Sequence, residues 1–426
     1  MLTNPKYSTL YLSIVIILVL SSCTSGMEKP IASTQPPDQA SATATPNPAT
    51  PFDLPPSKKG GETPAGTPTF AITPTPTLQR MSPDLVDASE IIDLEHVSAY
   101  PLGKIVSATI ALDDDFIYWV DTENPKALYR TPLGGGASEK IIESVYSDGR
   151  LDCNKFQISE DWLVVCDTPT SNDLGEWKIR AVNLKDKAEI LLLDDENGRI
   201  VFSMFDISLN GHNAIWTYAR TTPDLKDLDE MVIEAIDFDT GERRELMRTK
   251  IEGSIWPVLS LSGNLAIVEQ DFEDIYGGGT DLHLMDITDG TLKDLSLGEK
   301  SCMPEIAYPW AVWKSGARYA FWIKAVLHNL SNGQEFYIRN EGVEPSDPKI
   351  DGTRVYWTGS IRSTHGITNA IYIYDIGENK IYVLHAPGED QYYRFVAIRK
   401  NTIAWVRVTE MSKAVSDIYL EWTTFR

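Results

Sequence analysis

IYWVD, residues 117–121, is the first of seven short apolar stretches that recur along this chain. The other six read LVVCD, AIWTY, LAIVE, AVWKS, VYWTG and IAWVR and begin at Leu163, Ala214, Leu265, Ala311, Val355 and Ile403. Their third residues are separated by 46, 51, 51, 46, 44 and 48 residues, and five of the seven are Trp: Trp119, Trp216, Trp313, Trp357 and Trp405. A repeat of this length indicates an array of equivalent supersecondary units.

The residues around each stretch complete a unit of four strands. An apolar strand and a short turn precede the stretch, and a variable loop, a third strand, a tight turn and a fourth strand follow it. The tight turns combine Asp, Asn and Gly between apolar runs, as hairpins do. Examples are AIDFDTGERREL from Ala235, LMDITDGTLKDL from Leu284, LHNLSNGQEFYI from Leu327 and IYDIGENKIYVL from Ile373. The sequence therefore predicts an all-β fold, a seven-bladed β-propeller of four-stranded antiparallel blades.

Several copies resemble known propeller families. LSLSGNLAIVEQ and DLHLMDITDGTLKDLS, residues 259–270 and 281–296, resemble the TolB-like and WD40-like bacterial propellers, and residues 117–141 resemble a YWTD-type blade. This resemblance covers roughly Ile91 to Arg426. It implies the fold but leaves the function open, because propellers serve binding, scaffolding and catalysis alike. We expect the recurring Trp side chains to pack between blades rather than to form a ligand cage.

The end of the chain predicts how the ring closes. Apolar Ile418, Leu420 and Trp422 alternate with polar residues, as in a strand with one buried face. The seventh copy nevertheless has only three strands, whereas the others have four. Residues 90–95 (EIIDLE) resemble the fourth strands of other copies. We therefore predict that this N-terminal segment pairs with residues 417–424 and completes the last blade.

The first residues resemble the export signal of bacterial lipoproteins. Lys6 precedes an apolar run from Leu10 to Leu20, and Leu20-Ser21-Ser22-Cys23 resembles a lipobox. The resemblance implies cleavage of residues 1–22 and a lipid on Cys23, which would place the protein outside the cytoplasm on a bacterial membrane. An ordinary cleaved signal or an uncleaved anchor is the alternative. Residues 23–83 are rich in Pro, Thr and Ser, a composition that indicates a disordered linker. We predict that the propeller follows over residues 84–426.

Charge and cysteine content limit the partners and the redox state. The net charge of -23 disfavours nucleic acid and anionic lipid as partners, so we expect membrane contact only through the lipid anchor. We also expect the protein to be a monomer. Cys153 and Cys166 flank a predicted hairpin with its turn near residues 159–160. An exported protein could join them in a disulfide, and two buried thiols are the alternative. Cys302 is predicted to be a core residue.

The loops that follow the second strands are the predicted binding face. Asp271, Glu273, Asp274 and Asp281 could hold Ca²⁺ through carboxylate oxygens, or could simply be solvated. Tyr276 stands before three glycines and could contact a partner or a glycan. Arg362 and His365 add donor groups in the corresponding loop of blade six. No other cofactor is expected.

The sequence contains no recognisable catalytic motif. The Gly-x-Ser-x-Gly, phosphate-loop and HExxH patterns are missing, and no two of the six His have the spacing of metal ligands. The favoured hypothesis is a non-catalytic binding or scaffold module for a protein or saccharide partner. One alternative is a glycan or peptide hydrolase or lyase with its site at the axial mouth. Another is an envelope-protein assembly factor.

Overall fold

The computed structural model describes residues 79–81, 83–103, 110–120, 127–146, 149–151, 156–169, 177–194, 200–221, 228–250, 258–271, 280–295, 301–315, 324–338, 347–363, 366–388, 390–411 and 414–426. The chain divides into two compact units, Met1–Ala71 and Ile72–Arg426. All of the described residues belong to the second unit. None of the helices among them is long and apolar enough to cross a membrane.

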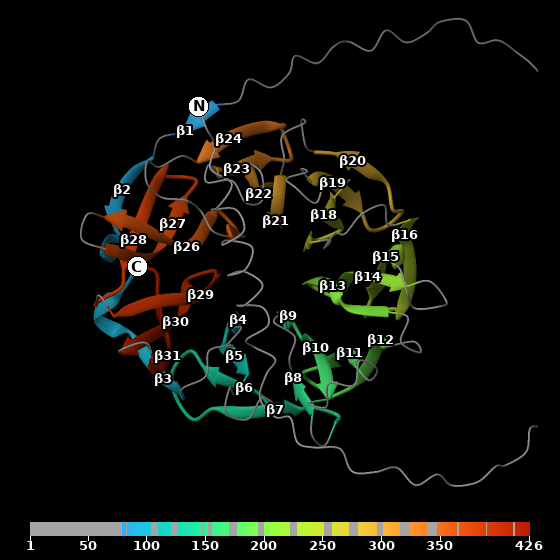
Figure 1. The fold of residues 1–426 in the computed structure, drawn as a ribbon, viewed down its shortest axis with the longest axis horizontal. Helices are drawn as coiled ribbons and strands as arrows, with labels where there is room; N and C mark the ends of the chain where they lie inside the picture. Colours follow the sequence, from blue (N-terminus) through green and yellow to red (C-terminus); the bar gives the residue numbers. More distant parts are fainter. Residues whose placement is uncertain are drawn as a thin grey trace, which may run out of the picture. The chain divides into compact units, whose positions relative to one another are not determined.

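The second unit is a ring of seven sheets, each of which is one blade (Figure 1). Blade one contains β4 (Ile110–Leu112), β5 (Phe116–Val120), β6 (Ala127–Pro132) and β7 (Glu139–Glu143). Blade two contains β8 (Gly149–Leu151), β9 (Gln157–Ser159), β10 (Trp162–Pro169), β11 (Lys178–Asn183) and β12 (Glu189–Asp194). Blade three contains β13 (Ile200–Asn210), β14 (Asn213–Thr221), β15 (Leu228–Asp237) and β16 (Glu242–Lys250). Blade four contains β17 (Leu259–Ser262), β18 (Leu265–Asp271), β19 (Thr280–Asp286) and β20 (Leu292–Asp294).

The remaining three blades include strands from the N-terminal segment, which add a fifth strand to blades five and six and supply the fourth strand of blade seven. Blade five contains β21 (Ser301–Ala307), β22 (Trp310–Ser315), β23 (Lys324–Asn329), β24 (Gln334–Ile338) and β1 (Gln79–Met81). Blade six contains β25 (Lys349–Asp351), β26 (Arg354–Ser363), β27 (Gly366–Asp375), β28 (Lys380–His385) and β2 (Asp84–Asp87). Blade seven contains β29 (Gln391–Arg399), β30 (Thr402–Met411), β31 (Ala414–Thr424) and β3 (Ser98–Gly103). The predicted seven-bladed, all-β fold is thereby confirmed.

A recurring turn joins the third strand of a blade to the fourth. Asp or Asn at the end of the third strand accepts backbone N–H groups two or three residues later, as Asp237 does from Asp239 and Thr240. The residue four positions after that Asp or Asn has a positive φ and donates its N–H back, as in Gly241 N to the Asp237 carbonyl at 2.8 Å. Gly suits this place because it has no Cβ to clash in the left-handed region.

Seven apolar clusters of described residues fill the seven interfaces between blades. The recurring Trp side chains lie in these clusters, and none of them is more than 4% exposed: Trp119, Trp216, Trp313, Trp357 and Trp405. Val165 and Ile267 occupy the same place in blades two and four and are equally buried. The prediction that these residues are core is confirmed. Burying each large side chain contributes about 1.5–3 kcal/mol to folding.

An N-terminal strand closes the ring, as predicted, but the predicted segment was wrong. β3 pairs antiparallel with β31, with Ser98 opposite Trp422 and Tyr100 opposite Leu420. Residues 90–95 instead form turns around the 3-10 helices η1 (Ala88–Glu90) and η2 (Leu94–His96), and meet the end of the chain through a single antiparallel bridge between Ile92 and Phe425. The carboxylates of Asp87 and Asp93 accept N–H groups at the starts of these helices and hold them as turns.

Two earlier strands extend the N-terminal segment along the outside of the ring. β1 pairs parallel with β24 of blade five, and β2 pairs parallel with β28 of blade six. With β3 on blade seven, the segment from Gln79 to Gly103 covers the outer edges of three consecutive blades (Figure 1). β1 lies before residue 84, where the propeller was predicted to begin.

Candidate functional site

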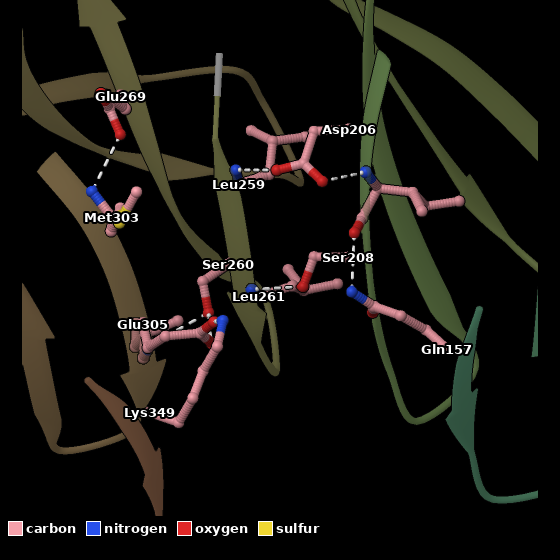
Figure 2. Close-up of polar contacts among 12 residues, drawn as sticks. Gln157, Asp206, Ser208, Leu259, Ser260, Leu261, Glu269, Met303, Glu305 and Lys349 are labelled. Atoms are coloured by element: carbon pink, nitrogen blue, oxygen red, sulfur yellow. Dashed lines mark hydrogen bonds and ion pairs between the residues drawn. The ribbon is translucent and has the colours of Figure 1, made fainter. Parts of the chain in front are cut away.

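The innermost strands are tied together by polar side chains that reach from one blade to the next (Figure 2). Asp206 and Ser208 of β13 accept the N–H groups of Leu259 and Leu261 of β17 at 2.8 and 2.9 Å. The N–H groups of Leu259 and Leu261 belong to the edge of β17 that faces away from β18, where no other described strand pairs. A buried N–H group without a partner would be costly, so these side chains stabilise the inner edge of the sheet.

The same arrangement recurs around the ring. Between blades two and three, Gln157 donates to the Ile207 carbonyl and accepts from the Leu209 N–H, both at 2.8 Å. Between blades four and five, Ser260 and Ser262 accept from the N–H groups of residues 306 and 308. Between blades five and six the contact is an ion pair, formed by Glu305 of β21 and Lys349 of β25. These inner-strand polar residues have a structural role, which the sequence alone did not reveal.

A buried charge pair in blade two helps to fasten this blade to blade one. Arg180 Nε lies 2.6 Å from Asp167 Oδ2, and both residues are buried. Asp167 also accepts the Val145 N–H at 3.0 Å, while Arg180 donates to the Glu143 carbonyl at 2.7 Å. Because Val145 and Glu143 belong to the connection out of blade one, this pair fastens neighbouring blades. It is a structural element rather than a binding site.

The face of the ring where second strands end and third strands begin is here called the loop face. Asp271 ends β18 and Asp281 follows the first residue of β19, so both lie at this face on blade four. Arg362 lies next to the end of β26, at the same face on blade six. Asp281 is exposed. Glu273, Asp274, Tyr276 and His365 lie outside the described residues, so the predicted cation or ligand site stays a prediction.

A charged cluster that the sequence analysis did not single out lies just inside the loop face. Glu269 of β18 is fully buried, and its Oε2 accepts the N–H of Met303 of β21 at 2.9 Å (Figure 2). Lys314 Nζ lies 3.7 Å from the Met303 sulfur and 3.3 Å from Asp347 Oδ1. This cluster links blades four, five and six. An acidic residue directly after the apolar LAIV of β18 was its only signal in the sequence.

Two innermost strands bulge opposite the buried Trp of the second strand. Pairing of β21 with β22 shifts between Cys302 and Glu305, and pairing of β29 with β30 shifts between Arg394 and Val396. Met303 and Phe395 lie in these bulges at φ values of 55° and 43°. A side chain other than Gly in this left-handed region costs about 1–3 kcal/mol, and such strain is concentrated at functional sites.

Phe395 lies in the bulge of β29, the innermost strand of blade seven. Among the described strands β29 pairs with β30 alone, and its other edge faces the ring interior (Figure 1). Tyr393 and Val396 pack toward blade six, while Tyr392 and Ala397 pack toward blade one. Phe395 belongs to neither cluster and is 41% exposed. Both faces of β29 thus pack against neighbouring blades, and Phe395 is an exposed aromatic residue on the strand that borders the ring interior.

The groups around Phe395 are held firmly. Burial raises the pKa of Tyr393, whose hydroxyl donates to the His385 carbonyl at 3.2 Å. Hydrogen bonding to Glu421 raises the pKa of Arg407 on the adjacent β30, so this guanidinium stays charged. Tyr393 and Val396 pack in the same cluster although they are three residues apart, but Tyr393, Phe395 and Ala397 alternate as in an unbroken strand, so the sequence carried no clear signal for the bulge.

The other predicted sites fall partly or wholly outside the described residues. Cys23 lies outside them, and so does Cys153, so lipidation and the disulfide stay predictions. Cys166 and Cys302 are both buried. Asp93, Glu95 and His96 of the closing segment place ligand atoms within 4.8 Å of one another. Hydrogen bonding to His96 lowers the pKa of Asp93, so this group already has an internal partner.

The fold and the ring interior define a class of protein, the seven-bladed β-propellers. No family model and no curated protein matches the sequence. Among solved structures, the β-propeller domain of the Trilobed protease from Pyrococcus furiosus matches 81% of this chain and 95% of its own, with 10% identity and a TM-score of 0.50. The acylaminoacyl peptidase of Pyrococcus horikoshii matches 74% of this chain, with 13% identity and a TM-score of 0.52. TolB from Acinetobacter baumannii matches 64% of this chain and 63% of its own, with 11% identity and a TM-score of 0.41.

At these identities the likeness concerns the fold alone. The chain spans about half the length of the acylaminoacyl peptidase, 51% of it. The Trilobed protease propeller is described as having an open Velcro topology, whereas here β3 pairs with β31 and closes the ring. The match to TolB, with its lower TM-score, supports no further conclusion, and membership of a TolB-like family stays a prediction.

Proposed function

We propose that this chain is a lipid-anchored, extracytoplasmic lipoprotein whose propeller binds a protein or saccharide partner in the ring interior and at the loop face. One observation carries the binding role. β29, which borders the ring interior, holds Phe395 at a strained, left-handed φ of 43° and leaves 41% of it exposed, whereas the nearby Tyr393 is buried. An exposed aromatic side chain held at a cost in free energy is typical of a contact residue.

The anchoring half of the proposal rests on the sequence of the first 23 residues, and it has its own test. Replacing the lipidated residue, Cys23→Ala, should move the protein from the membrane to the soluble fraction when cells are fractionated. Cys23→Ser should behave in the same way, because neither side chain can carry a thioether-linked lipid. Retention of both variants on the membrane would contradict lipidation.

The binding half is tested by photo-crosslinking at two exposed aromatic positions. Para-benzoylphenylalanine replaces either Phe395 of the inner strand β29 or Tyr308, which is 57% exposed in the turn between β21 and β22. That turn lies at the end of the blade opposite the loop face. Irradiation of cells should give a discrete adduct from position 395 and not from position 308. Adducts from position 308 alone, or from neither position, would contradict a binding site in the ring interior.

A further inference from the structure

Among the described residues, Arg394, the neighbour of Phe395, has no carboxylate partner, whereas nearby arginines have one. Arg407 lies 2.7 Å from Glu421, and Arg399 lies 3.7 and 3.8 Å from carboxylate oxygens of Asp114 and Asp351. No described acidic residue forms an ion pair with Arg394, whose guanidinium lies 5.2 Å from the centroid of the Tyr392 ring. In a chain with 61 acidic and 38 basic residues, an arginine left without an acidic partner stands out.

Stacking on Tyr392 leaves the edge of this guanidinium available. When a guanidinium lies over an aromatic ring, its N–H groups still point outward in the plane of the guanidinium. Two of them can then donate to both oxygens of one carboxylate. Phe395 supplies an apolar surface one residue away, at about 3.8 Å between α-carbons. Both residues belong to the bulge of the inner strand, where the register with β30 shifts between Arg394 and Val396.

We infer that Arg394 and Phe395 form a subsite for a peptide carboxylate that adjoins an apolar side chain. The inference rests on the proposed function, because it names the chemistry that the ring interior recognises. Arg394 binds the carboxylate, and Phe395 contacts the neighbouring apolar group. The carboxylate is that of an Asp or Glu side chain or of a C-terminus.

The charge of the chain favours a peptide over an acidic polysaccharide. A net charge of -23 repels any ligand that carries many negative charges. A uronic-acid polymer brings one carboxylate with each sugar, and one arginine offsets only one of them. A peptide segment can instead present a single carboxylate beside an apolar residue. Arg and aromatic residues are also the side chains that dominate protein–protein contacts.

Four pools of fluorescent hexapeptides test the subsite on the full-length chain in detergent. Two amidated pools contain Phe-Asp or Phe-Asn between randomised uncharged residues. The other two end in Phe with a free or an amidated carboxyl group. Fluorescence anisotropy gives the affinity of each pool. We expect at least one carboxylate pool to bind roughly tenfold to hundredfold more tightly than its neutral counterpart, as a charge-assisted bidentate contact allows. The pair that differs identifies the source of the carboxylate.

Two variants and one matched control tie this preference to the subsite. Arg394→Gln should abolish the difference between the pools, while Arg399→Gln, on the same strand but with acidic partners, should preserve it. Phe395→Gly should weaken binding to all pools and leave the melting temperature unchanged or higher, since Gly relieves the positive φ. A loss of binding caused only by misfolding would lower the melting temperature instead.

The opposite results would overturn the inference. These are equal affinity for charged and neutral pools, a preference that survives Arg394→Gln, or Arg394-dependent binding of oligogalacturonate with no binding of any peptide pool. Failure of the inference can be told apart from failure of the proposed function. If position 395 captures a partner by crosslinking but Arg394→Gln does not reduce that capture, the binding role stands and the carboxylate subsite is wrong.

Discussion

His212 lies in the turn between β13 and β14, where its imidazole meets carboxylates from two blades. Nε2 lies 2.6 Å from Glu160 Oε2 of blade two, and Nδ1 hydrogen bonds to Asp239 in the turn after β15. The pKa of His212 is raised above its ordinary value of 6.5. The main cause is the hydrogen bond to Asp239, and Glu160 contributes further. Protonated His212 thus joins the turns of blades two and three.

The sign of the resulting pH dependence follows from this raised pKa. A raised folded-state pKa means that folding stabilises the protonated form. The contribution is complete below about pH 6.5, the unfolded value, and is lost as pH rises through the folded-state pKa. Wild type should therefore exceed His212→Gln in melting temperature at pH 6, with a smaller difference at pH 9. A difference that is constant over this range would show that the imidazole does not titrate between these carboxylates.

At the level of elements, the turn between third and fourth strands is the part that the sequence predicts best. Asp or Asn begins it, and Gly241, Gly290 and Gly333 occupy the position of positive φ in blades three to five. In blade two the same position is Lys187, at a φ of 63°. Its N–H donates to the Asn183 carbonyl at 3.0 Å, so the turn has the same form but an unfavourable residue.

Exchanging these residues should change stability in opposite directions. Lys187→Gly is expected to raise the free energy of unfolding by about 0.5–1 kcal/mol, because Gly adopts positive φ without steric cost. Gly241→Lys should lower it by a similar amount; a Cβ at Gly241 would meet no atom within 4 Å, so the cost is conformational. Urea unfolding of both variants measures the two effects. Equal signs for the two changes would contradict the turn model.

The elements that the sequence did not predict depend on strand register and turn capping, which the pattern of apolar residues does not reveal. The bulge at Phe395 was not predicted, because Tyr393, Phe395 and Ala397 also alternate as an unbroken strand would; only the register with β30 shows otherwise. The closing strand was misplaced because residues 90–95 have strand-like apolar residues, whereas Asp87 and Asp93 cap turns there. Of the predicted loop-face residues, Asp271, Asp281 and Arg362 lie at one face of the ring, whereas Arg394, which we infer to bind the ligand, had no motif around it.

At the scale of the whole propeller, the two ends of the described chain stabilise each other. The Asp93 N–H donates to the Thr424 carbonyl at 3.0 Å, and the Arg426 N–H donates to the Ile91 carbonyl at 2.8 Å. Ala88 and Ile92 are fully buried in the cluster between blades six and seven. The N-terminal segment is thus part of the core of the last blade, while β1 and β2 are additional strands on blades that already have four.

Stepwise truncation from the N-terminus should therefore give an uneven loss of stability. A chain that starts at residue 83 loses β1, and one that starts at residue 88 also loses β2; both should still unfold in one cooperative transition. A chain that starts at residue 104 also loses β3. It lacks Ala88, Ile92 and Leu102, which are all buried in the complete propeller.

Removing that apolar surface and the ladder with β31 should lower the free energy of unfolding by on the order of 5 kcal/mol, a large part of the stability of a typical domain. It would also leave β31 as an unpaired edge, which favours association between molecules. Calorimetry and light scattering on the three chains measure both effects. If the chain starting at residue 104 matched the melting temperature of the one starting at residue 88 and stayed monomeric, β3 would not be what closes the ring.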